Sequence, residues 1–141
     1  TIFKLPSFAK GGHVTARKQR PLIYSCSGCS DVAQLANNVA IRLDHAGDFE
    51  MSCISGVGGK VPALVKTASS GRPITVIDGC PLHCARACLA QHGVVANVHI
   101  TLSSYGLRKR YREDCSEEEI SALLDDMKDI IASDRMQLRA G

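Results

Sequence analysis

The stretch Ile74-Thr75-Val76-Ile77-Asp78-Gly79-Cys80-Pro81 decides the fold. Its first four residues form a β-branched apolar run, which predicts a short buried strand over 74–77. The strand is expected to stop at Asp78-Gly79-Cys80, and Pro81 stands where the first turn of a helix tolerates proline. The sequence therefore predicts a strand that leads directly into a helix, which runs to about His92 and is stopped by Gly93.

Strand-like and helix-like segments alternate on both sides of this stretch. We expect further strands over 21–25, 49–53 and within 94–102, and helices that start near Asp31, Val61 and Ser116. The pairs Asp31 with Gln34 and Ser116 with Glu119 are each spaced as a capping box. This alternation predicts an α/β fold: a three-layer Rossmann-like or flavodoxin-like parallel sheet of about four strands with helices on both faces.

Length and composition are typical of one folded domain. The chain has 141 residues, of which 45% are hydrophobic and 22% are charged. We expect an N-terminal basic arm over 1–20 and a single α/β metal-binding domain over 21–141. The net charge of +3 is too small to indicate nucleic acid as a partner. No apolar run approaches the ~20 residues that a membrane span needs, and no charged-then-apolar signal is visible, so we expect no membrane partner and a cytoplasmic location.

Cysteine is the exceptional residue type. Seven cysteines occur, and this odd count does not suit a disulfide framework. Cys26, Cys53 and Cys80 lie at the ends of the first, second and third predicted strands. Because the carboxyl ends of parallel strands meet at the same edge of a sheet, we expect these thiols to converge. Randomly placed core cysteines would rarely show this pattern.

Two further cysteines follow Cys80 in the predicted helix. Cys84 is one helical turn beyond Cys80 on nearly the same face, so both could face one ion. Cys88 is a further turn away, and one tetrahedral zinc ion, with sulfur ligands at ~2.3 Å, cannot easily bind both ends of that series. We therefore expect Cys88 to pack against the site or support it.

The motif Cys26-x-x-Cys29 allows two interpretations. Between a strand and a helix, such a pair is typical of thioredoxin-like redox sites, where the helix N-terminus stabilises a thiolate. The same spacing also chelates zinc. Cys53 and Cys80 at the same edge favour the metal interpretation, because a redox pair needs no third and fourth thiol.

These motifs together resemble the DGC domain family, which is named after its central Asp-Gly-Cys. The resemblance covers roughly residues 20–115. It implies a zinc-binding domain with four chelating cysteines, and mapped residue by residue it implicates Cys26, Cys53, Cys80 and Cys84. We expect Cys29 to be the substitute ligand. The motifs that carry it are, in order, Cys26-Ser27-Gly28, Met51-Ser52-Cys53-Ile54-Ser55-Gly56-Val57-Gly58-Gly59 and Ile77-Asp78-Gly79-Cys80-Pro81-Leu82-His83-Cys84-Ala85.

Two classes of function follow. In the first, a cysteine-thiolate site binds zinc, or an iron–sulfur cluster as the alternative, and the protein stores, delivers or senses a metal or handles sulfur. In the second, the protein is an enzyme. Cys80, at a helix N-terminus, would then be the nucleophile of a disulfide reduction or sulfur transfer, with Cys84 or Cys29 as resolving thiol. The sequence leaves this choice open, and it also leaves a homodimer open.

A shallow cleft is expected beside the thiols, because loops separate where the strand order of a parallel sheet reverses. A small anionic or thiol ligand is therefore an expected partner besides the metal ion. Residues 56–59 are expected to form a tight turn, since their surroundings fit neither the Walker A nor the Rossmann glycine pattern. We expect Asp78 to bind amides at the helix start and His83 to point away from the thiols. Residues 108–112 are expected to be solvated, with a phosphate or acidic partner as the alternative.

Overall fold

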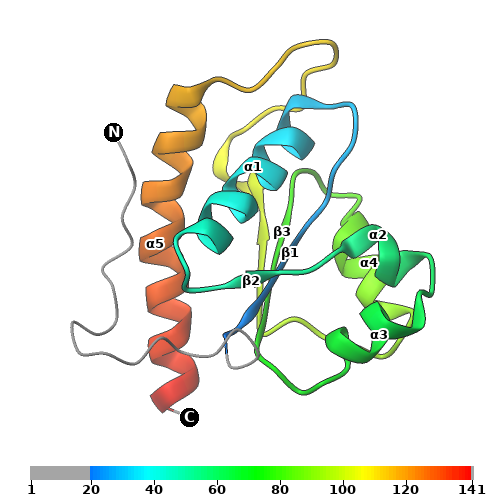
Figure 1. Ribbon diagram of the computed structural model, residues 1–141. Coiled ribbons are helices and arrows are strands. Elements are labelled where there is room, and N and C mark those ends of the chain that lie inside the picture. The colour runs from blue at the N-terminus through cyan, green and yellow to red at the C-terminus, as the bar shows by residue number, and fades with distance from the viewer. Residues whose placement is uncertain (1–19, 141) are drawn as a thin grey trace.

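Four parallel strands form one sheet in the order β2-β1-β3-β4 (Figure 1). They are β1 (Leu22–Ser25), β2 (Glu50–Met51), β3 (Ile74–Asp78) and β4 (Val98–Thr101). The computed structural model describes residues 20–140, so the predicted arm over 1–20 lies outside the described residues except for Arg20. The order 2-1-3-4 matches the first four strands of a flavodoxin-like sheet. The predicted parallel α/β fold is confirmed.

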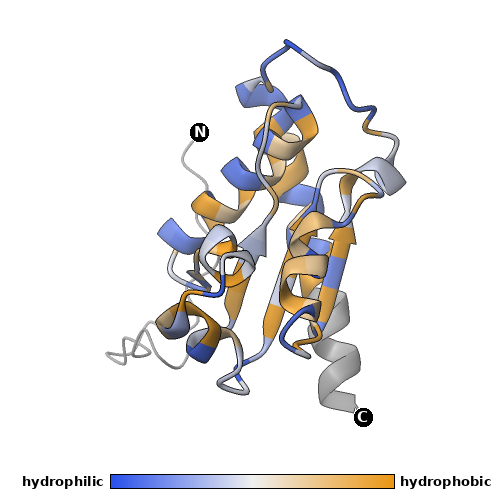
Figure 2. Cartoon of the chain, turned by 90° about the vertical axis from the view of Figure 1, so that its right-hand side faces the viewer, coloured by the Kyte–Doolittle hydropathy of each residue, from blue (hydrophilic) through white to orange (hydrophobic). Residues whose placement is uncertain are grey.

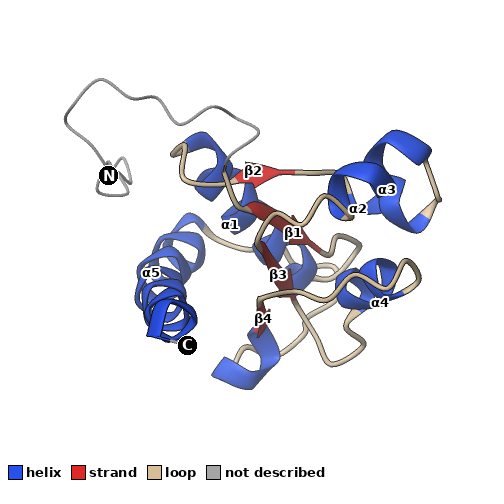
Figure 3. Cartoon of the chain, turned by 90° about the horizontal axis from the view of Figure 1, so that it is seen from below, coloured by secondary structure: helices blue, strands red, loops and turns tan. Residues whose placement is uncertain are grey.

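Helices cover both faces of this sheet, which gives three layers (Figure 3). On one face lie α1 (Asp31–His45) and α5 (Glu117–Ala140), which contact each other. The other face is covered by α2 (Ile54–Gly58), α3 (Pro62–Ala68) and α4 (Cys84–Ala90). A short 3₁₀ helix, η2 (Leu102–Tyr105), follows β4. No helix among the described residues is both long enough and apolar enough to cross a lipid bilayer.

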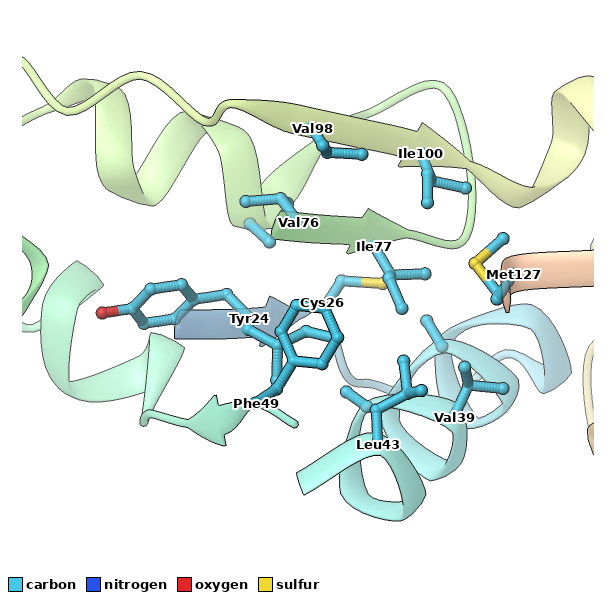
Figure 4. Close-up of a cluster of buried hydrophobic side chains, with 14 of the residues drawn as sticks. Tyr24, Cys26, Val39, Leu43, Phe49, Val76, Ile77, Val98, Ile100 and Met127 are labelled. Atoms are coloured by element: carbon cyan, nitrogen blue, oxygen red, sulfur yellow. The ribbon is translucent and has the colours of Figure 1, made fainter. Parts of the chain in front are cut away.

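Part of the core lies where α1 and α5 pack on the sheet (Figure 4), and Val57, Ala85 and Leu89 of α2 and α4 extend it on the other face. The apolar positions at helical spacing in α1 and α5 are buried except Ile130, which is partly buried, and side chains of β1, β3 and β4 complete the cluster. The loop between η2 and α5 is strongly hydrophilic, whereas the strands are mostly hydrophobic (Figure 2). The buried apolar residues at this helical spacing are Val32, Leu35, Ala36, Val39, Ala40 and Leu43 of α1 and Ile120, Leu123, Leu124, Met127 and Ile131 of α5.

Both predicted capping boxes start close to real helices, but only the second has the predicted partners. Ser116 Oγ accepts a hydrogen bond from the Glu119 amide at 3.1 Å at the start of α5. For α1 the cap is Ser30, whose hydroxyl accepts from the Ala33 amide at 3.3 Å, and Asp31 is already helical. The hydroxyl of Ser30 fits the cap position, so the carboxylate of Asp31 is left for another role.

The predicted glycine turn over 56–59 is wrong, because most of this segment forms the short helix α2. Its glycines serve close packing instead. A Cβ atom on Gly56 would lie 1.9 Å from Leu64 Cδ1 of α3, and one on Gly58 would lie 2.9 Å from Cys88 Sγ of α4. Small residues therefore let α2 sit directly against both neighbouring helices.

The strand order reverses between β1 and β3, where Gly79 follows β3. A Cβ atom on Gly79 would lie 2.7 Å from the Val32 carbonyl oxygen, in the first turn of α1. Glycine is thus required at this position so that α1 can approach the end of β3 at the switch point. This contact fixes the edge of the sheet where ligand sites form in such folds.

Replacement of Gly79 tests this packing. Gly79→Ala should lower the free energy of unfolding by about 1–3 kcal/mol or more, because the added methyl group meets a helix backbone that cannot rotate away. Gly56→Ala is the matched control, and it should cost less because the atom it meets first is the end of the Leu64 side chain. Urea unfolding followed by circular dichroism measures both. Equal costs for the two variants would show that the α1 backbone does not require glycine at position 79.

Candidate functional site

Three of the predicted cysteines follow strand ends at one edge of the sheet, as expected. Cys26 follows β1 directly, Cys53 follows β2, and Cys80 follows β3. All neighbouring strands are parallel, so these positions share the carboxyl edge. The thiols of Cys80 and Cys84 are close enough to Cys26 for their charges to raise its pKa. Cys26, Cys53 and Cys80 thus share one edge of the sheet, and Cys80 and Cys84 lie near Cys26.

Cys26 is the buried member of this group. Only 9% of the residue is exposed, and it belongs to the hydrophobic cluster of Figure 4. Its Sγ atom accepts a hydrogen bond from the Gly79 amide at 3.1 Å. Burial raises the pKa of the Cys26 thiol to about 11, and the negative charges of Asp78, Cys80 and Cys84 add to this rise, against the effect of the Gly79 amide. In this state Cys26 is therefore a protonated thiol at neutral pH.

Asp78 organises the chain on the other side of the strand end. Its carboxylate is 1% exposed, and it accepts hydrogen bonds from the amides of Ala85 at 2.9 Å and Arg86 at 3.3 Å. The predicted contact between Asp78 and amides at the helix start is confirmed. The Nε2 atom of His99 lies 2.8 Å from the second carboxylate oxygen. Because an ionised carboxylate only accepts, His99 donates through this nitrogen.

The helix after β3 begins later than expected, at Cys84 and not near Pro81. His83 has a left-handed backbone with φ of 53°, which interrupts the helix, and its side chain makes no cap. The ring of His83 instead lies 2.9 Å from Thr101 Oγ1 and packs edge-on to the ring of His99, with centroids 4.8 Å apart. The side chain of His83 thus points toward β4.

Two expectations about Cys80 are therefore wrong. Cys80 lies in the turn before α4, so it is neither one helical turn from Cys84 on a common face nor placed at a helix N-terminus. Cys84 takes the first helical position instead, with its thiol exposed. The left-handed His83 separates the two cysteines, and a sequence pattern does not reveal that backbone conformation.

The remaining cysteines have separate surroundings. Cys53 is exposed at the start of α2, where the hydroxyl of Ser55 at 3.1 Å and the amide of Gly56 lower its pKa. Cys29 is exposed, whereas Cys88 is half-buried against Gly58, which fits the expected packing role. Cys115, near Asn38 Nδ2 at 3.7 Å, contacts α1 outside this group.

The donor chemistry of this edge fits zinc, because thiolates are preferred ligands of that ion. The side chains of these cysteines, however, lie too far apart to form such a site in this structure. Within residues 20–131, no three His, Cys, Asp or Glu side chains lie close enough together to hold a metal ion. The turn that carries Cys80 and the exposed Cys84 and Cys53 side chains would have to move toward Cys26 for four thiolates to share one ion.

A cleft of about 530 Å³ opens beside Cys80. One wall follows the turn after β3, and the other follows the segment after β4. The contact with Tyr111 is the main cause that raises the pKa of Lys109, and the nearby thiols of Cys80 and Cys29 add to this rise. The cleft was expected at the switch point between β1 and β3, but this one lies between the segments that follow β3 and β4, and Cys80 is the thiol that lines it. Its lining residues are Cys80, Pro81, Leu82, Ser103, Gly106, Leu107, Arg108 and Lys109.

Asp31 and Arg110 fasten the second wall to α1. The Arg110 amide donates to one carboxylate oxygen of Asp31 at 2.5 Å, its Nε atom donates to the other at 2.6 Å, and the Asp31 amide donates back to the Arg110 carbonyl at 3.1 Å. The guanidinium group also pairs with Glu119 at 3.0 Å. Burial alone would raise the pKa of Asp31, but the hydrogen bonds from Arg110 outweigh it and the pKa is lowered. The basic segment 108–112 is thus anchored through Arg110, and all five of its residues are exposed, as expected.

A model of the DGC domain family matches residues 22–127, and this range contains every residue of the edge and cleft described above. The chain belongs to the DGC domain family. This DGC domain is 58% identical over 111 residues to the anaerobic and virulence modulator AnvM of Pseudomonas aeruginosa, a match that covers 79% of this chain and 85% of AnvM. No solved structure matches the chain.

Three site residues were not assigned a role from sequence: His99, Arg110 and Lys109. Alternation along β4 does place His99 and Thr101 on the face opposite Val98 and Ile100. Their contact with Asp78 and His83, however, depends on β4 pairing with β3, which places Asp78 opposite Thr101. Arg110 lies far along the chain from Asp31, and no local pattern links the two.

Thiol reactivity tests the surroundings of Cys26 and Cys53. After metal is removed with a chelator, iodoacetamide near neutral pH should modify Cys53 first, because it is exposed and its pKa is lowered. Cys26 should be modified last, because it is buried and its pKa is about 11. Mass spectrometry of the peptides gives each rate, and the same measurement in urea is the control, where the difference should vanish. Similar rates for Cys26 and Cys53 in the folded protein would refute this ordering.

Asp31→Asn tests the anchor. It should lower the free energy of unfolding at neutral pH by about 1–3 kcal/mol, because Arg110 loses an ionised partner. The folded pKa of Asp31 lies below its ordinary value of 3.8, so this stabilisation is complete above that pH and is lost as the pH falls through the folded pKa. The gap between wild type and variant should therefore shrink below about pH 4.

Asp125→Asn is the control for this experiment, because Asp125 is exposed and pairs with Lys128 at 3.8 Å. Its effect should be within about 0.5 kcal/mol at any pH. A gap between wild type and Asp31→Asn that stays constant down to pH 2 would rule out a lowered Asp31 pKa as its cause.

Proposed function

We propose that this DGC domain is a regulatory protein that binds zinc through thiolates at the carboxyl edge of its sheet. Cys26, Cys80 and Cys84 would form the centre of the site, Cys53 would be the fourth ligand, and Cys29 the substitute. The observation that carries the proposal is the placement of Cys26, Cys53 and Cys80 after β1, β2 and β3 at one edge of the sheet, with Cys84 at the start of the following helix. Bound zinc would crosslink the segments that carry these cysteines and fix the cleft beside them.

The regulatory part of the proposal is supported by the relative from Pseudomonas aeruginosa, which is named as an anaerobic and virulence modulator. A metal-thiolate site suits such a role, since thiolate ligands respond to oxidants and to metal supply. A cytoplasmic location, where thiols stay reduced, belongs to the same proposal.

The enzyme hypothesis built on Cys80 loses its physical basis. It required the N-terminus of a helix to activate this thiol. Cys80 precedes α4 and is separated from it by the left-handed His83, so the helix does not supply that activation. Sulfur transfer by Cys80 is therefore the weaker of the two functions.

Metal analysis of anaerobically purified protein tests the proposal. We expect about one zinc per chain and no visible absorption band, whereas a band would indicate an iron–sulfur cluster. Cys80→Ser and Cys84→Ser should each weaken zinc binding at least tenfold. Cys115→Ser is the matched control, because Cys115 is also a partly buried cysteine but lies outside the group. The proposal would be contradicted if the purified protein contained no metal, or if all three variants bound zinc with equal affinity.

A further inference from the structure

The cleft beside Cys80 has walls of two kinds. Pro81, Leu82 and Leu107 give it apolar surface, and Leu82 is 72% exposed, so its side chain is accessible to a ligand. Arg108 and Lys109 give it two positive charges. A cleft with an apolar wall and fixed cations fits an organic molecule that has an apolar body and a negative group.

These two cations are not neutralised within the described part of the chain. Among the described residues, every ion pair of segment 108–112 is made by Arg110. Its partners are Asp31, Glu113 and Glu119. Lys109 instead lies over the ring of Tyr111, with Nζ 4.9 Å from its centroid, a contact that leaves the charge in place. The two charges are therefore available to a ligand.

The cations are also held in position. Arg110, the next residue along the chain, is tied through its main chain and its side chain to Asp31. The following residue, Tyr111, forms a bridge with Ser30, the cap of α1. This double attachment sets the second wall of the cleft against the start of α1, so a ligand does not have to order that wall on binding.

We propose that the cleft formed by residues 80–82 and 103–109 binds a small organic anion, with its apolar body against Leu82 and Leu107 and its negative group at Arg108 and Lys109. The proposal rests on the cleft and its charges and not on zinc. It goes beyond the metal site by giving the regulator a place for a small-molecule signal next to a thiol of that site.

Two matched probes test the proposal on the full chain as purified. The first is 8-anilinonaphthalene-1-sulfonate, an organic anion, and the second is N-phenyl-1-naphthylamine, which has the same aromatic body without the charge. Fluorescence titration should show one saturable site for the anion. In the double variant R108Q/K109Q its Kd should rise about sevenfold, as expected when two unit charges at about 7 Å are removed in water. The neutral probe should bind this variant unchanged.

Two further variants locate the site. K66Q/R112Q removes the same net charge outside the cleft lining, and it should leave both affinities unchanged. Leu82→Ser should weaken both probes severalfold, and it is not expected to disturb folding because Leu82 is mostly exposed. The proposal is overturned by any of three results: no saturable binding, equal loss of the anion in both double variants, or no effect of Leu82→Ser.

Zinc content separates this proposal from the metal site. R108Q/K109Q should carry the same zinc as the wild type, because neither residue is a proposed ligand. If the chain binds no zinc but the anion still binds through Arg108 and Lys109, the metal proposal fails alone. If zinc binds as expected and the anion does not saturate, the cleft proposal fails alone.

Discussion

The hydrogen bonds of the buried Asp78 carboxylate are the interactions on which the structure at the carboxyl edge of the sheet depends. From the end of β3 it accepts hydrogen bonds from two amides of α4 and from His99 of β4. It therefore supplies the cap that His83 does not provide, and it fixes where Cys84 begins its helix. A buried charge is unfavourable unless it is hydrogen-bonded. Loss of these partners would therefore leave an unpaired carboxylate in the interior and destabilise the fold.

Gly79 and Cys80 extend the role of Asp78 to the rest of the site. Gly79 lies against the Val32 carbonyl of α1 and donates its amide to Cys26, so the middle residue of Asp-Gly-Cys links three elements through its backbone. Cys80 then enters the cleft. The three residues of the motif thus have distinct physical roles, since the first caps a helix, the second allows a close approach and the third supplies an accessible thiol.

The fold and the position of the thiols could be predicted from sequence because they follow from local periodicity and from a rule of topology. The β-branched run at Ile74 and the strand-end placement of Cys26 and Cys53 needed no long-range information. The start of α4 was missed because His83 has a left-handed backbone, and its contact with Thr101 joins residues far apart in the chain. The anchor between Asp31 and Arg110 was missed for the same reason: partners far apart in the chain leave no local pattern.

Zinc K-edge X-ray absorption of the protein as purified tests most directly whether the thiols at this edge bind the metal. We expect a shell of sulfur ligands at about 2.3 Å, with one sulfur fewer in Cys84→Ser and no change in Cys115→Ser. A shell of only nitrogen or oxygen ligands at about 2.0–2.2 Å, or the same sulfur count in both variants, would contradict the assignment of the metal to the thiols at this edge of the sheet.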